Sequence, residues 1–218
     1  MTIGTVWERY GNGMKIETVI DTVIGWIDQL GWINKFSDED GQAATKVKSV
    51  LFVCWGNVCR SPAAEIILKQ EMKRLGMNGS RIKSAGICPD GQRGIPSWPM
   101  LWASIRRGVW LRPQPRMLRK EDFDDFDVVI AMDREVLFSI ETIVKCKPKN
   151  VWLLSEFLPE NSRIDVPDPM CRPVSVCNRV LDMLQTACKP ISQHIQFNQS
   201  ELDQSEFVAK TTHESVLA

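Results

Sequence analysis

The stretch Val47-Lys-Ser-Val-Leu-Phe-Val-Cys-Trp-Gly-Asn-Val-Cys-Arg-Ser-Pro62 decides the fold of this chain. Its first seven residues are rich in β-branched and aromatic types, which predicts a short strand buried on both faces. The residues from Ser61 to Leu75 predict a helix with a capping hydroxyl, a proline at its start and Gly76 as its stop. The stretch therefore predicts a strand, a loop and a helix in direct succession.

The loop between these two elements has a cysteine, five residues, an arginine and a serine, with Cys54 and Arg60 near its ends. Backbone N–H groups at the end of a parallel strand and the start of a helix can form a cradle for an anion. The positive field of such a loop favours the thiolate form of Cys54 without help from a histidine. The planar guanidinium of Arg60 can bind two oxygens of one phosphoryl group. Phosphate is therefore the expected ligand.

Other interpretations of this loop are weaker. It has no Gly-Lys-Ser/Thr ending and no glycine-rich dinucleotide fingerprint. A zinc site on Cys54 and Cys59 would have to recruit Cys88, Cys171 or Cys177 from elsewhere, and cysteines are also ordinary core residues. We expect neither a metal nor a cofactor.

Strands and helices alternate along the rest of the chain. Further strands are predicted at 81–86, 127–132 and 151–154, and helices at 100–107 and 174–194. Alternation of this kind predicts an α/β, three-layer fold with a central, mostly parallel four-stranded sheet and helices on both faces.

Three regions are expected. Residues 1–45 form an N-terminal extension with an amphipathic helix, 46–196 the globular domain, and 197–218 a disordered tail. Acidic residues interrupt the apolar run of the N-terminal helix, so we do not expect it to span a membrane. An intramolecular contact and a contact with a partner both remain open for it.

Composition excludes several classes of function. The 218 residues include 27 Lys+Arg and 27 Asp+Glu, so a net charge of zero gives no reason to expect a nucleic-acid partner. Seven cysteines without an apolar leader at the start of the sequence favour reduced thiols in the cytoplasm. The two histidines, His194 and His213, offer little for a metal site or a Cys–His catalytic pair.

Four ordered motifs make the region from about 46 to 194 resemble the low-molecular-weight protein tyrosine phosphatases. They are the Cys54 loop, Ser84-Ala-Gly86, Arg116–Phe123 with Phe126–Asp133, and Val166-Pro-Asp-Pro169. The resemblance implies that Cys54 is the nucleophile, Arg60 the phosphate clamp and Asp168 the general acid.

The resemblance also implies that one set of residues binds phosphate or supports the loop: Trp55, Gly56, Asn57, Val58, Cys59, Ser61 and Ser84. Among them, Asn57, Ser61 and Ser84 resemble the residues that hold the loop and the thiolate by hydrogen bonds. Cys59 is either a small residue at the helix start or a resolving thiol that forms a reversible disulfide with oxidised Cys54.

Asp168 also suits a general acid on chemical grounds. A monoester leaving group departs with negative charge, so a carboxylic acid must protonate it, and the resulting carboxylate can then activate water. Two flanking prolines stiffen the loop that carries Asp168, although an ordinary Pro-Asp-Pro turn would have the same local sequence.

The substrate pocket departs from the family pattern. Where the family usually has aromatic walls, this chain has Asp90, Met170 and Cys171. Trp55 offers a compensating ring face, and Trp98 and Trp102 either lie close to the pocket or pack in the core.

The predicted function is hydrolysis of phosphotyrosine in proteins, or of small aryl phosphates, through a phosphocysteine intermediate. The aliphatic Val58 favours an aromatic ester over phosphoarginine. The alternatives are an arsenate reductase of the same fold, with Cys88 as a relay thiol, and a catalytically weak phospho-binding regulatory module.

Overall fold

The structure is a computed structural model that describes residues 47–77, 79–89, 94–145 and 148–215, with side chains as far as Ile195. The chain divides between Thr45 and Lys46. The expected N-terminal helix lies outside the described residues, and so does Asp90.

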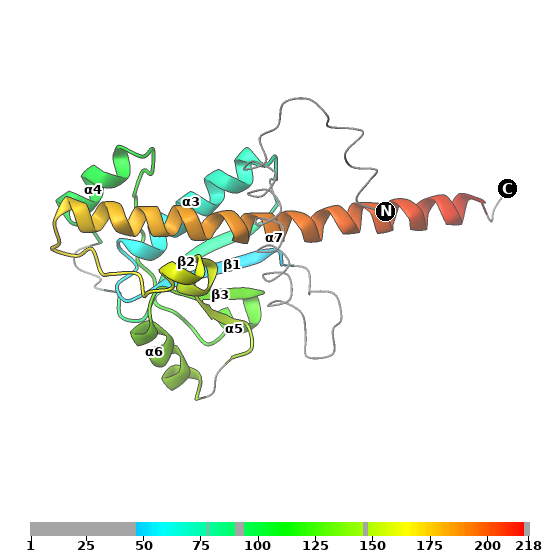
Figure 1. Cartoon of the computed structure of the whole chain (residues 1–218). Coiled ribbons are helices and arrows are strands. Elements are labelled where there is room, and N and C mark those ends of the chain that lie inside the picture. The colour runs from blue at the N-terminus through cyan, green and yellow to red at the C-terminus, as the bar shows by residue number, and fades with distance from the viewer. Residues whose placement is uncertain (1–46, 78, 90–93, 146–147, 216–218) are drawn as a thin grey trace, which may run out of the picture. The chain divides into compact units, whose positions relative to one another are not determined.

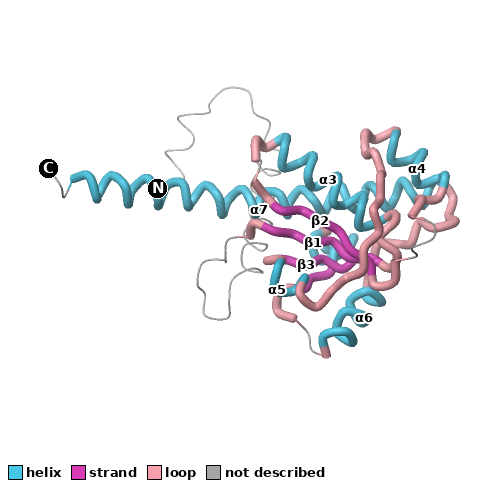
Figure 2. Tube along the Cα trace, turned by 180° about the vertical axis from the view of Figure 1, so that it is seen from behind, coloured by secondary structure: helices cyan, strands magenta, loops and turns pink. Residues whose placement is uncertain are grey.

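The described elements are β1 (Ser49–Cys54), α3 (Arg60–Arg74), β2 (Arg81–Gly86), α4 (Trp98–Ile105), α5 (Asp122–Asp125), β3 (Val128–Ala131), α6 (Arg134–Val144), β4 (Val151–Leu153), two short 3-10 helices (Leu154–Phe157 and Glu160–Ser162) and α7 (Val174–Ser215). Each strand is followed by a helix, and α5 and α6 are helices that were not predicted from the sequence. The four strands are all parallel, in the order β2-β1-β3-β4. Helices α3 and α7 cover one face of the sheet, and α5 and α6 lie on the other (Figures 1 and 2). The predicted three-layer α/β fold is confirmed.

The order of the strands fixes where a ligand can bind. After β1 the chain crosses to β2 on one side and then returns to β3 on the other, so the order reverses at β1. Ligands of open parallel sheets bind at the carboxyl ends of the strands where the order reverses. Cys54 is the last residue of β1, and Asp133 follows β3 by two residues, so both lie at this edge.

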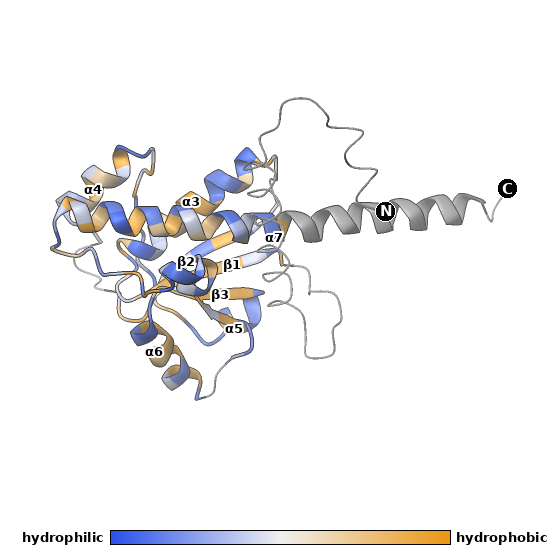
Figure 3. Ribbon diagram, in the orientation of Figure 1, coloured by the Kyte–Doolittle hydropathy of each residue, from blue (hydrophilic) through white to orange (hydrophobic). Residues whose placement is uncertain are grey.

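The sheet is the centre of the core. All six residues of β1 and all four of β3 are buried, which agrees with the nearly continuous apolar sequence of strands covered on both faces. Leu51 and Val53 of β1 belong to one buried cluster with Phe126, which follows α5, and Ile140 of α6. Figure 3 shows this apolar character along β3.

Helix α3 begins differently from the prediction. It starts at Arg60, so Ser61 is inside the helix and caps nothing; no side chain caps this helix. The Ser61 hydroxyl instead lies 3.0 Å from the Cys54 sulfur. The predicted stop is confirmed: Gly76 has φ +75°, a conformation that favours glycine.

Helix α7 is longer than predicted. We expected it to end near His194 and a disordered tail to follow from 197, but the helix continues to Ser215. The extra segment contains no glycine or proline, and the helix formers glutamine and glutamate are frequent in it, so propensity allows the helix to continue. Within the described residues, no helix is long and apolar enough to cross a membrane.

We predict that Asp122→Ala lowers the free energy of unfolding by about 2 kcal/mol. The buried Asp122 carboxylate accepts two hydrogen bonds from the Arg116 guanidinium, at 2.9 and 3.0 Å, and one from the Arg119 backbone. Asp125 on the same short helix makes only an exposed ion pair at 3.7 Å, so Asp125→Ala should cost less than about 0.5 kcal/mol. Urea unfolding of both variants measures the difference, and equal losses would contradict the prediction.

Candidate active site

The Cys54 thiol lies at the centre of a hydrogen-bond network. It is almost completely buried, and its Sγ is 3.0 Å from the Oγ of Ser61. The Ser61 hydroxyl accepts a hydrogen bond from Asn57 Nδ2 at 3.0 Å and donates to the Ala85 carbonyl oxygen at 3.3 Å. Its one hydrogen can turn from that oxygen to the sulfur, which is closer, when Cys54 is a thiolate. The network therefore offers a donor to a thiolate.

Asn57 shapes the loop. Its φ is +53°, in the left-handed region that asparagine tolerates better than most residues, and it is fully buried. Its amide bridges two parts of the chain, because Nδ2 donates to Ser61 and Oδ1 accepts from the Arg116 backbone at 3.0 Å. The loop is thus held by one hydrogen bond within it, to Ser61, and by a second one to the Arg116 backbone.

The loop also presents backbone donors. Helix α3 makes its first backbone hydrogen bond from Ala63 to Cys59. In the described part of the chain, no backbone N–H of residues 55–61 meets an acceptor in the protein. Free N–H groups at a helix start, together with the helix dipole, make a site for an anion.

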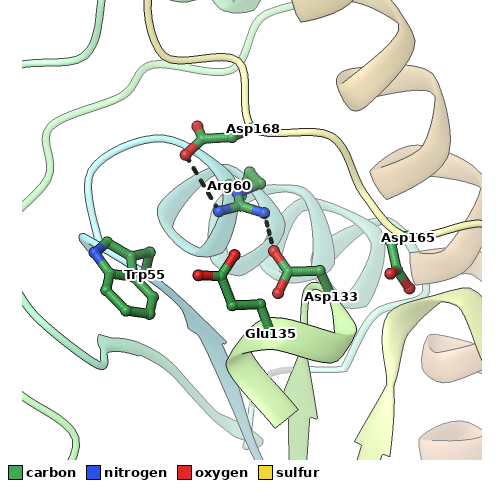
Figure 4. A pocket seen from close by; sticks show the side chains of 6 residues that line it. All are labelled: Trp55, Arg60, Asp133, Glu135, Asp165 and Asp168. Atoms are coloured by element: carbon green, nitrogen blue, oxygen red, sulfur yellow. Dashed lines mark hydrogen bonds and ion pairs between the residues drawn. The ribbon is translucent and has the colours of Figure 1, made fainter. Parts of the chain in front are cut away.

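Arg60 is buried and held from one side. Its Nη1 pairs with Asp133 Oδ2 and donates to the Val166 carbonyl oxygen at 3.1 Å. Its Nη2 lies 3.5 Å from Asp168 Oδ2, a longer contact with a carboxylate that is 56% exposed. Figure 4 shows the guanidinium between the two carboxylates. Asp133 therefore fixes the guanidinium, while Asp168 lies on its open side.

The three residues that the resemblance assigns to catalysis line one cavity of about 340 Å³. They come from three separate segments: the end of β1, the start of α3 and the loop before α7. The other described residues that line it are Trp55, Gly56, Val58, Cys59, Cys88 and Met170. The structure thus brings the predicted nucleophile, phosphate clamp and general acid together.

A second, more polar cavity of about 440 Å³ adjoins the first and shares Trp55, Arg60 and Asp168 with it. Its remaining lining residues are the acidic Asp133, Glu135 and Asp165 (Figure 4).

Not every predicted site residue joins the site. The Ser84 hydroxyl donates to Glu65 Oε2 of α3 at 2.6 Å, so it joins β2 to the helix and does not support the loop. Cys171 is exposed and does not line either cavity among the described residues, whereas Met170 lines the smaller one.

The tryptophans of α4 are not core residues. Trp98 is 74% exposed and Trp102 48%, so the interpretation that they pack in the core is wrong. The buried face of α4 is formed by Met100, Ala103 and Ser104. The two indoles therefore lie on the outer face of this helix.

Sequence reasoning gave no role to Asp133 or Gly86. Asp133 could have been found from its position, because polar residues that directly follow parallel strands gather at one edge of the sheet. Gly86 is required for a close approach: a Cβ there would lie 2.8 Å from the Trp55 carbonyl oxygen and 2.9 Å from the Asn57 nitrogen. No local pattern signals this contact.

The cysteines differ in their surroundings. The six described cysteines, which include Cys54, Cys59 and Cys88, are free thiols. Burial raises the pKa of the Cys59 thiol to about 12, against the lowering effect of a hydrogen bond from the Ser97 backbone. Among the described residues, no group of three or more His, Cys, Asp or Glu could hold a metal ion.

Fold and site together define a class of α/β proteins that bind a phosphoryl group next to a cysteine thiol. A family model described as "Low molecular weight phosphotyrosine protein phosphatase" matches residues 49–201. The chain belongs to this family.

Individual relatives support membership of this family. The chain is 33% identical over 152 residues to a low molecular weight protein-tyrosine-phosphatase of Bacillus subtilis, covering 68% of this chain and 96% of the relative. It is 33% identical over 132 residues to the corresponding chicken phosphatase, Gallus gallus, covering 58% and 82%. A crystal structure of a protein tyrosine phosphatase from Entamoeba histolytica superposes with a TM-score of 0.62 at 28% identity, covering 69% of this chain and 98% of that one.

We predict that Gly86→Ala lowers the free energy of unfolding by about 2 kcal/mol and reduces phosphate binding, because the new methyl group would contact loop backbone that cannot move aside. Gly79→Ala is the matched control, since no atom lies within 4 Å of its added Cβ. Thermal unfolding with and without inorganic phosphate measures both effects. Similar behaviour of the two variants would show that the approach of β2 to the loop is not constrained.

Proposed function

We propose that this protein hydrolyses phosphotyrosine in proteins, or small aryl phosphates, through a phosphocysteine intermediate. The convergence of Cys54, Arg60 and Asp168 on one cavity is the observation that carries the proposal. Membership of a phosphotyrosine phosphatase family supports it. Free thiols at the site suit a reducing compartment such as the cytoplasm.

In the first step, the Cys54 thiolate attacks phosphorus and the bond to the tyrosine oxygen breaks. The Ser61 hydroxyl donates to the sulfur, and the loop N–H groups and Arg60 bind the phosphoryl oxygens as their charge develops. Arg60 exchanges its long contact with Asp168 for phosphate oxygens. Asp168 is then free to face the leaving oxygen and protonate it.

In the second step, the Asp168 carboxylate takes a proton from water, which attacks phosphorus. The sulfur–phosphorus bond breaks, inorganic phosphate forms and the Cys54 thiolate returns as the leaving group. The Ser61 hydroxyl that donates to the sulfur when Cys54 is the nucleophile also donates to it when Cys54 is the leaving group, because the sulfur is the same atom in the same position in both steps.

The aryl ring of the substrate has two side chains to pack against. Trp55 is partly exposed and lines both cavities, and Met170 lines the smaller one. An indole face and a thioether both pack well with aromatic rings. We propose that they replace the aromatic walls that are usual in the family.

We predict that the purified protein hydrolyses p-nitrophenyl phosphate in the presence of a chelator. Cys54→Ser should lower kcat by at least about 10³-fold, since the nucleophile is lost. Asp168→Asn should lower kcat by about 10²-fold for phenyl phosphate and by less for p-nitrophenyl phosphate, whose leaving group needs less protonation. Steady-state rates and the release of inorganic phosphate measure these effects.

Cys171→Ser is the control, because this exposed cysteine does not line the cavities. Unchanged turnover in Cys54→Ser would overturn the mechanism. An equal loss for both substrates in Asp168→Asn would remove the general-acid role from that residue.

We also propose that Cys59 is the resolving thiol for oxidised Cys54, since both side chains line the same cavity. Peroxide converts the Cys54 thiolate to a sulfenic acid, and attack by the Cys59 sulfur forms the disulfide and releases water. Burial keeps Cys59 protonated, which slows this attack.

The expected result is that a thiol reductant restores activity to the peroxide-treated wild type but not to Cys59→Ser, whose Cys54 oxidises further. Cys88→Ser is the matched comparison, because Cys88 lines the same cavity but is exposed. Peptide mapping identifies the disulfide. Recovery that depends on Cys88 instead of Cys59 would contradict this assignment.

A further inference from the structure

An apolar groove of about 300 Å³ lies on the surface formed by α4 and the start of α7. Its described lining residues are Trp98, Pro99, Trp102 and Val174. No charged residue is among them, in contrast to the acidic side chains around the larger cavity near Arg60. Figure 1 shows α4 beside the first turns of α7, and the two helices are in contact.

The two tryptophans are not needed for the packing of α4. They are four residues apart, so they lie on the same face of the helix, and that face is turned to solvent. Exposed aromatic pairs of this kind are costly in water and are enriched where proteins bind one another. The groove is therefore suited to binding an apolar group.

The groove lies near the catalytic cavity, although the two share no lining residue among those described. The Ser97 backbone, which directly precedes α4, donates a hydrogen bond to the Cys59 thiol, and Cys59 lines the cavity. Met170, which is exposed, also lines the cavity and stands four residues before Val174 in the same segment. Four residues of extended chain span at most about 14 Å, so a peptide that places a phosphorylated side chain in the cavity can reach the groove with residues a few positions away.

We propose that this groove binds apolar side chains close to the phosphotyrosine of a protein substrate, so that Trp98 and Trp102 determine substrate specificity. The proposal rests on the proposed phosphatase activity. The occupant is an extended peptide segment, because successive residues of an extended chain advance about 3.3–3.6 Å and can follow the surface from cavity to groove. Leucine, valine or an aromatic residue suits the apolar lining.

The test compares two phosphotyrosine peptides of equal length, with leucines or with serines at the two positions on each side of the phosphotyrosine. We expect the wild-type protein to show about a tenfold higher kcat/KM for the leucine peptide, as burial of an apolar side chain on a surface allows. Trp98→Ala should remove most of this preference and leave the hydrolysis of p-nitrophenyl phosphate unchanged.

Trp110→Ala is the matched control, because Trp110 is 64% exposed and does not line the groove. It should keep the full preference. Equal rates for the two peptides in the wild type, or an equal loss of preference in both variants, would overturn the docking proposal. Failure of the wild type to hydrolyse p-nitrophenyl phosphate would instead overturn the proposed function.

Self-association is the competing use of such a surface. Sedimentation at the assay concentration measures it. If Trp98→Ala converts a dimer to a monomer while the peptide preference stays unchanged, the groove is an interface between copies of this chain and the proposal is wrong. A monomeric wild type with the expected preference supports it.

Discussion

The site depends on one strained turn, at Asn57. A left-handed residue there lets the loop reverse between the end of β1 and the start of α3 within five residues. Asparagine adopts this conformation at moderate cost, and its buried amide offsets that cost by two hydrogen bonds, to Ser61 and from the Arg116 backbone. Without this turn, neither the loop N–H groups nor Arg60 would lie next to the Cys54 thiol.

Support for the turn extends outward through polar contacts. Arg116 donates its backbone N–H to Asn57, and its side chain is held by the buried Asp122. Gly86 accepts a backbone hydrogen bond from Leu118 and donates one to Arg116 at the point where β2 meets the loop. The segment after α4 therefore acts as a base for the phosphate loop, and two of the motifs shared with the family have this structural purpose.

Much of this could be predicted from the sequence because the signals are local. Buried strands such as β1 and β3 are continuous apolar runs. The five residues between Cys54 and Arg60, placed between a strand and a helix, indicate a phosphate-binding loop. The contacts that could not be predicted join distant residues: Ser84 to Glu65, Asp133 to Arg60, and Gly86 to the loop backbone. The exposure of Trp98 was also missed, because helical spacing alone does not tell which face of a short helix is covered.

Asp133 explains how Arg60 can be buried and still bind a phosphoryl group. Removing a guanidinium from water is costly unless an anion accompanies it, and Asp133 together with the Val166 carbonyl oxygen supplies this partner from one side only. Nη2 is left with the longer contact to the exposed Asp168. A phosphoryl group therefore meets a guanidinium that is already oriented, and the reorganisation that binding would otherwise require is made during folding. The acidic residue next to the anion site thus favours phosphate binding, although its charge alone would oppose it.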